Sequence, residues 1–287
     1  MMLLFLWLFF GVSSEAFQPL NLNAISQKSF STFLANIEDA GSESEKEKKG
    51  KLQFRASKTF VSDPLPLSPP ESERALEHLI LDDDTIIDIL RGAGNEALCA
   101  PQDITISNVD AWERECENFG VKAPSLANGD KVFWVTTGMN FPGLRISSRS
   151  FIGVKGLTPT RDPLFPYPGL EFVLIKDEQE VEGTPPLRWI FNKLTGSSGG
   201  DKGEQSVRSL NRVTIEPSSD GKEMVFQSNV LLEIDVQFPS IFLKLLPVSK
   251  DKAEEQGSAS ISKALDKDIV PALKRLRDSW EKVSRET

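Results

Sequence analysis

Hydrophobic and polar residues alternate most clearly over 223–238. The apolar residues fall on one face, with Ser228 as the only polar interruption: Met224, Phe226, Val230, Leu232, Ile234, Val236 and Phe238. This period of two predicts a strand with one buried face and one wet face. Asp220-Gly221 just before it predicts a hairpin turn to a strand over 206–216, so the sheet is expected to be antiparallel.

Other stretches rich in β-branched and aromatic residues predict strands at 52–61, 131–137, 143–154 and 170–175. The proline-rich segment 62–70 must be a loop, because proline can neither continue a helix nor donate to a strand ladder.

Two short helices are predicted to follow that loop. Ser68 and Pro69 suit the start of a helix through 75–80. The triplet Asp82-Asp83-Asp84 suits the cap of a second helix over 85–91, which Gly92 would end.

The chain is expected to close with an amphipathic helix over 261–284. Its apolar residues recur at steps of three and four: Ile261, Leu265, Ile269, Leu273, Leu276, Trp280 and Val283. Pro271 is expected to kink this helix or to split it in two.

The predicted fold class is therefore α+β. The order of strand, two short helices, meander of strands and long terminal helix is similar to that of the helix-grip fold of START-like proteins. In that fold a curved antiparallel sheet grips the C-terminal helix and can leave a cavity between them.

The first residues resemble a targeting leader. Met1–Val12 is an apolar run too short to span a bilayer comfortably, and it suits a signal peptide cut before Phe17. The residues 14–19, SEAFQP, resemble the Ala-Phe-x-Pro junction of plastid leaders in diatoms, cryptophytes and related algae.

We therefore expect a signal peptide at 1–16, a transit peptide and charged linker at 17–50, and a single α+β domain at 51–287. The expected location is the plastid, reached through the ER, in the stroma or on the stromal face of the thylakoid. Secretion is the alternative.

Charge and composition exclude some classes of function. The chain has a net charge of −9, and residues 51–287 carry −7, which disfavours nucleic acid as a partner. Its two cysteines, Cys99 and Cys116, are expected to be ordinary thiols, although a single bridge between them stays open. With one histidine, His78, a multi-histidine metal site is excluded.

No catalytic constellation is expected. Residues 196–200, GSSGG, match the pattern of a nucleophile elbow, but they lie in a loop and no histidine follows them. We expect His78 to be a partly buried structural residue and the aspartate triplet to be a cap. Glu178, Glu180 and Glu182 are expected to form a solvated edge or turn. No cofactor and no metal are predicted.

The candidate ligand-binding residues are basic and aromatic: Trp134, Arg145, Arg149, Arg188, Trp189, Phe238 and Phe242. Arg145 and Arg149 are expected to point outward. If they pointed inward, they would anchor the head group of an amphiphile beneath the terminal helix. The apolar segment 238–247 is expected to pack into the core, or else to touch a membrane or cover a pocket.

Several segments also resemble an uncharacterised cyanobacterial and plastid family, the domain-of-unknown-function family nineteen-ninety-seven. They are FRASKTF at 54–60, ALEHLI at 75–80, LRISSRSFIG at 144–153, PPLRWIF at 185–191 and DSWEKV at 278–283. The resemblance spans about 52–283. It departs at Asp278-Ser279, where the family has Asp-Tyr, and at 107–130, which is longer here. It implies a role in photosynthetic lineages and supplies no catalytic residues.

The function expected from the sequence is non-enzymatic binding of a lipid, pigment or isoprenoid in a cavity between the sheet and the C-terminal helix. One alternative is an assembly or interaction factor of the thylakoid membrane or a photosynthetic complex, without a small ligand. The other is a cyclase- or hydratase-type enzyme on the same fold.

Overall fold

The computed structural model describes residues 49–66, 71–91, 98–141, 144–159, 165, 167–183, 185, 207–218, 220, 222–239 and 249–286. The predicted signal and transit peptides lie outside these ranges, so both stay predictions.

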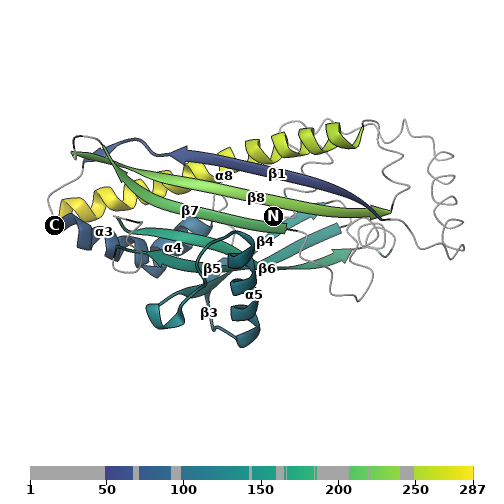
Figure 1. Ribbon diagram of the computed structural model, residues 1–287, viewed down its shortest axis with the longest axis horizontal. Coiled ribbons are helices and arrows are strands. Elements are labelled where there is room, and N and C mark those ends of the chain that lie inside the picture. Colours follow the sequence, from purple (N-terminus) through teal and green to yellow (C-terminus); the bar gives the residue numbers. More distant parts are fainter. Residues whose placement is uncertain are drawn as a thin grey trace, which may run out of the picture.

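One antiparallel sheet runs through the molecule, with its strands in the order β1-β8-β7-β6-β5-β4-β3 (Figure 1). The strands are β1 Lys49–Val61, β3 Leu98–Gln102, β4 Lys131–Phe141, β5 Leu144–Leu157, β6 Gly169–Gly183, β7 Val207–Pro217 and β8 Glu223–Pro239, with the two-residue β2 Leu65–Pro66 beside β8. From β3 to β8 each strand pairs with the next along the chain, and β1 then pairs with β8 in antiparallel register. The predicted antiparallel sheet is confirmed.

The described helices are α3 Glu71–Leu81, α4 Asp83–Leu90, α5 Ile106–Asn118, the short 3-10 helix η2 Leu126–Asn128 and α8 Lys250–Glu286. Asp82 caps α4, because its carboxylate accepts a hydrogen bond from the backbone N–H of Thr85 at 3.1 Å. The predicted capping role of the first aspartate is confirmed.

The C-terminal helix α8 begins well before the predicted position and continues through Pro271 as one helix, so it is not split. Its first turns carry few apolar residues, and the apolar stripe could therefore not reveal them. Among the described residues no helix combines the length and the apolar character needed to cross a membrane.

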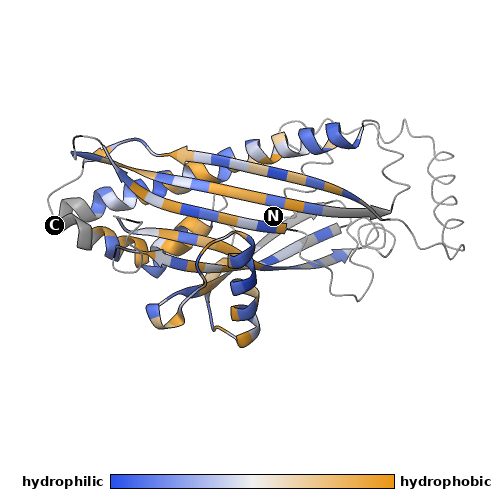
Figure 2. Cartoon of the chain, in the orientation of Figure 1, coloured by the Kyte–Doolittle hydropathy of each residue, from blue (hydrophilic) through white to orange (hydrophobic). Residues whose placement is uncertain are grey.

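The inner core lies between one face of the sheet and the helices α3, α4 and α8. The sheet contributes alternate residues, such as Phe54, Phe133, Phe172 and Phe226, and each of these side chains is buried. The residues of α8 in the inner core belong to the predicted stripe: Ile261, Leu265, Leu273, Leu276 and Trp280, with Ile269 packed beside them. In Figure 2, apolar positions recur along β8 and β7. The predicted α+β fold, an antiparallel sheet with a long C-terminal helix, is confirmed.

The opposite face of the sheet, here called the outer face, carries a second core that the sequence analysis missed. Helix α5, inserted between β3 and β4, packs Trp112 and Cys116 against Val132, Val173 and Ile175. The contact needs a glycine on β5: a Cβ on Gly153 would lie 2.1 Å from the Trp112 ring. The sheet is therefore buried on both faces where α5 covers it.

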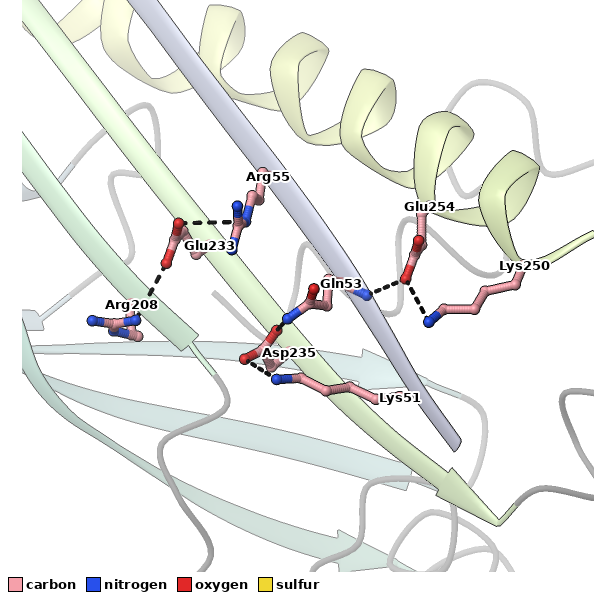
Figure 3. A network of polar contacts seen from close by, with 8 residues as sticks. All are labelled: Lys51, Gln53, Arg55, Arg208, Glu233, Asp235, Lys250 and Glu254. Atoms are coloured by element: carbon pink, nitrogen blue, oxygen red, sulfur yellow. Dashed lines mark hydrogen bonds and ion pairs between the residues drawn. The ribbon is translucent and has the colours of Figure 1, made fainter. Parts of the chain in front are cut away.

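Helix α8 also protects the free edge of β1, beside which it runs in Figure 1. The backbone N–H of Gln53 donates to the Glu254 carboxylate at 2.8 Å, and that of Arg55 donates to the Ser258 hydroxyl at 3.1 Å. Figure 3 shows the first of these bonds reaching from the helix to the strand. Such capping removes the unpaired N–H groups through which an edge strand would recruit another chain.

Candidate functional site

Most described side chains on the inner face of the sheet are apolar, and two small clusters of polar groups are hydrogen-bonded across neighbouring strands there. Lys58 and Lys131 also lie on this face, where they pair with Asp266 of α8 and Asp83 of α4. In the first cluster, the hydroxyl of Ser228, which is 1% exposed, is hydrogen-bonded to Asn211 Oδ1 at 2.8 Å. This is the serine that interrupts the predicted alternation of β8. Its bond to the neighbouring strand satisfies it within the core.

In the second cluster, the hydroxyls of Ser148 and Ser150 both donate to Asp177 Oδ1 at 2.6 Å. Ser150 is the register partner of both Val135 and Asp177, and Val135 belongs to the inner core. Directly paired residues of neighbouring strands share a face. The Asp177 cluster, meaning Ser148, Ser150 and Asp177, therefore faces inward from β5 and β6.

The chemistry of the Asp177 cluster favours ligands that donate hydrogen bonds. The two serines donate to one carboxylate oxygen of Asp177, so the cluster presents an acid flanked by two hydroxyls. The charge of a carboxylate favours a hydroxyl or ammonium group as its complement over a carboxylate or phosphate. The sequence analysis missed it, because two serines on one strand and an aspartate on another carry no motif.

The structure places the predicted residues Trp134, Arg145 and Arg149 on the outer face. Trp134 pairs with Phe151, which packs against the outer core. The Arg149 guanidinium lies over the rings of Trp134 and Phe151, at 4.9 and 5.2 Å from their centroids. Both arginines are exposed, so the outward orientation is confirmed. The alternative, in which they anchor a ligand beneath α8, is wrong because strand alternation turns them away from that helix.

The other candidate residues fall outside what the structure describes. Arg188, Trp189 and Phe242 lie outside the described residues, as do 196–200 and most of the apolar segment 238–247. Phe238 belongs to β8, but its side chain is not described.

Two interpretations of polar residues need correction. His78 is exposed on α3, although it was expected to be partly buried: it lies on the solvent side of the helix, between the buried Leu76 and Leu79. Glu178, Glu180 and Glu182 are exposed as expected, but they lie within β6 and form no turn. In the described part of the chain, no three His, Cys, Asp or Glu residues are placed to hold a metal ion.

The two cysteines are free and buried. Cys99 belongs to the inner core and Cys116 to the outer core, so the sheet separates them and the bridge left open by the sequence does not form. Burial raises the pKa of each thiol to about 11. Both are therefore protonated, weakly reactive core residues at neutral pH.

Comparison with known proteins adds little to this picture. No protein-family model and no curated protein matches the chain. Among solved structures, norcoclaurine synthase from Thalictrum flavum is similar at a TM-score of 0.28 and 12% identity, over 74% of this chain and 87% of that one. An uncharacterised protein from Rhizobium leguminosarum is similar at a TM-score of 0.17 and 13% identity, over 78% of this chain and 99% of that one. Similarity at this level carries no inference about function.

Proposed function

We propose that the protein binds, without chemical conversion, a hydrophobic molecule with a hydroxyl or amine end, between the inner face of the sheet and α8. A lipid alcohol, an isoprenoid or a pigment has this chemistry. The observation that carries the proposal is the Asp177 cluster, an acid with two hydroxyls on an inner face that is largely apolar. Ligand sites typically combine an apolar lining with a few polar groups that set the orientation of the ligand.

The polarity of the Asp177 cluster narrows the ligand class expected from the sequence. Arg145 and Arg149 lie on the outer face, and Lys58 and Lys131 on the inner face are paired with acids of α8 and α4. The Asp177 cluster is an acid supported by two hydroxyls. The support for this ligand class is the electrostatic match between the Asp177 carboxylate and a ligand that donates hydrogen bonds. We further propose that the protein works in a plastid, on the strength of the leader-like residues 14–19 and of the segments that resemble a photosynthetic family.

The test is native mass spectrometry of the full chain purified from a plastid-bearing host, followed by organic extraction of whatever travels with it. We expect a stoichiometric ligand with a hydroxyl or amine group. Asp177→Asn should lower its occupancy at least fivefold, because the amide loses the charge and one acceptor position.

Glu178→Gln is the matched control, because it removes the next carboxylate along β6, whose side chain is exposed on the outer face. Its ligand occupancy should equal that of the parent protein. A ligand-free protein from the plastid-bearing host would contradict the proposal and favour the assembly-factor alternative. Equal losses in both variants would contradict the role given to the Asp177 cluster.

A further inference from the structure

The outer face holds a small pocket that plays no part in the proposed function. It has a volume of about 110 Å³ and lies between the segment that follows α5 and the strands β5, β6 and β7. Pockets for drug-sized molecules measure roughly 300–1,000 Å³, so this one suits only a small molecule or ion. Its polar lining residues are Lys122, Ser125, Asn128, Asp130, Lys155, Glu171 and Arg212.

The floor of the pocket is a buried ion cluster of one acid and two bases. Glu171 is 1% exposed; its Oε1 lies 2.5 Å from Lys155 Nζ, and its Oε2 accepts from Arg212 Nε at 2.7 Å. The Lys155 side chain is 8% exposed and also donates to the backbone carbonyl of Lys122 at 2.5 Å. With Lys122 and the buried Asp130 included, three bases and two acids line the pocket, so its lining carries one net positive charge.

The hydrogen-bond donors and acceptors that line the pocket indicate what kind of ligand would complement it. Glu171 Oε2 accepts from Arg212, whereas the buried Oε1 lies beside the Lys155 ammonium as an ion pair and accepts no hydrogen bond from the described residues. Asp130 accepts from the backbone N–H of Ser125 at 2.7 Å. The Lys155 ammonium has three N–H groups and two partners. The two terminal nitrogens of Arg212 donate to no acceptor among the described residues. The terminal N–H groups of Arg212 thus remain as charged donors at the pocket, and a charged donor that finds no acceptor on burial is costly.

We propose that this pocket binds a small oxyanion, either a phosphate group or a carboxylate. Arg212 and Lys155 supply the charged donors from the sheet, and Asn128 supplies an amide at the rim from η2. A guanidinium with both terminal nitrogens open to a ligand matches the paired oxygens of either anion. The ligand would also join the inserted segment to three strands.

The experiment is a thermal melt of the full chain titrated with sodium phosphate and, separately, sodium acetate, at constant ionic strength set with sodium chloride. We expect a saturable rise in Tm with at least one of the two anions, because a ligand that binds only the folded state stabilises it by mass action. The stronger anion identifies whether the natural ligand presents a phosphate or a carboxylate. Arg212→Gln should weaken the apparent affinity at least tenfold.

Arg208→Gln is the matched control. Arg208 lies on the same strand and face, pairs with the buried Glu115 at 3.2 Å, and does not line the pocket. Phosphate also stabilises proteins that have no specific phosphate site. Such a non-specific rise in Tm would be the same in Arg208→Gln and Arg212→Gln. If Arg212→Gln proves too unstable to measure, Asn128→Asp places a negative charge at the exposed rim and should abolish the saturable rise.

The absence of a saturable rise with either anion would overturn the proposal. The proposal would also be overturned if Arg212→Gln bound the anion with the affinity of the parent protein. It would be overturned as well if Asn128→Asp kept the saturable rise in Tm. None of these outcomes bears on the ligand proposed beneath α8, which lies on the other side of the sheet.

Discussion

Glu171 shows how far a single residue in the sequence can indicate a buried ion cluster. It interrupts the apolar run 170–175, where the content of β-branched and aromatic residues predicts a strand. The inner neighbours Leu170 and Phe172 pack in the main core, so Glu171 turns to the outer face. A lone acid within an apolar strand is a signal that a buried partner must exist. Its partners Lys155 and Arg212 come from adjacent strands, and only the strand register brings them together.

At the same scale, the two thiols should make folding stability depend on pH. The folded thiols ionise near pH 11 and unfolded ones near 9.0. Between these values the folded state holds more protons, so the free energy of unfolding should fall as the pH rises from 9 to 11. Below pH 9 the thiols contribute no pH dependence. Urea unfolding followed by circular dichroism at pH 8, 9 and 10 measures the effect.

Cys99→Ala and Cys116→Ala provide the comparison for this prediction. Each variant should lose less stability between pH 8 and pH 10 than the parent protein, because one thiol no longer titrates. Iodoacetamide gives an independent measure, since thiolates are the reactive form. Alkylation of the folded protein at pH 8 at the rate of the unfolded chain would show that neither thiol is buried as described.

At the scale of elements, the contact between α8 and β1 depends on how closely they approach. Gly257 on the helix faces Phe54 on the strand, and a Cβ there would lie 2.3 Å from the aromatic ring. Beside this contact, Glu254 and Ser258 cap the strand edge, and Lys58 pairs with Asp266 further along the helix. The helix thus uses polar residues of its first turns to close the sheet edge, and apolar residues from Ile261 onward to fill the core.

Gly257→Ala should therefore destabilise the protein, against the usual preference of helices. Replacing glycine by alanine in a helix normally gains about 1 kcal/mol. Here the added methyl meets the Phe54 ring, and overpacking costs about 1–3 kcal/mol. We expect a net loss of up to about 2 kcal/mol in the free energy of unfolding, measured with urea.

The double variant Phe54→Leu with Gly257→Ala separates the steric effect from other causes. Its loss should be smaller than the sum of the two single losses, because leucine makes room for the methyl group. Gln256→Ala, one position away on the exposed side, should change stability by less than about 0.5 kcal/mol. A stabilising Gly257→Ala would show that helix and strand lie further apart.

At the scale of the whole molecule, the sheet separates two cores. The inner core is shared with α3, α4 and α8, and the outer core belongs to α5. A chain of ion pairs crosses the outer face from Arg55 through Glu233 to Arg208, and on to the buried Glu115 of α5. Figure 3 shows the part of this chain that joins β1, β8 and β7.

Val173→Asp tests the covered outer face. Val173 is fully buried beneath α5, so a charge there should cost about 3 kcal/mol or more. Thr136→Asp is the control: it places the same charge on the outer face of β4, opposite Arg149 and away from the outer core, and should be nearly neutral. Chemical denaturation measures both. Similar small losses would mean that α5 does not cover the sheet.

The sequence alone predicted the central residues of strands β1 and β4 to β8, the two short helices and the apolar stripe of α8, although it ended β6 at residue 175 instead of 183. Each has a local signal: alternation, a capping aspartate, or a repeat of three and four residues. It could not indicate α5, whose apolar residues are few because only one side of a single helix meets the sheet. Nor could it settle the face on which Arg149 lies.

Only the tertiary structure decided which polar side chains meet. The Asp177 cluster and the Lys155–Glu171–Arg212 cluster each combine residues from different strands. Strand register and a bulge between Phe151 and Ile152 set these encounters, and a shift of one residue would turn every side chain to the other face. Local patterns predicted most of the elements, but not β3 or α5, and the long-range pairing of strands determined the sites.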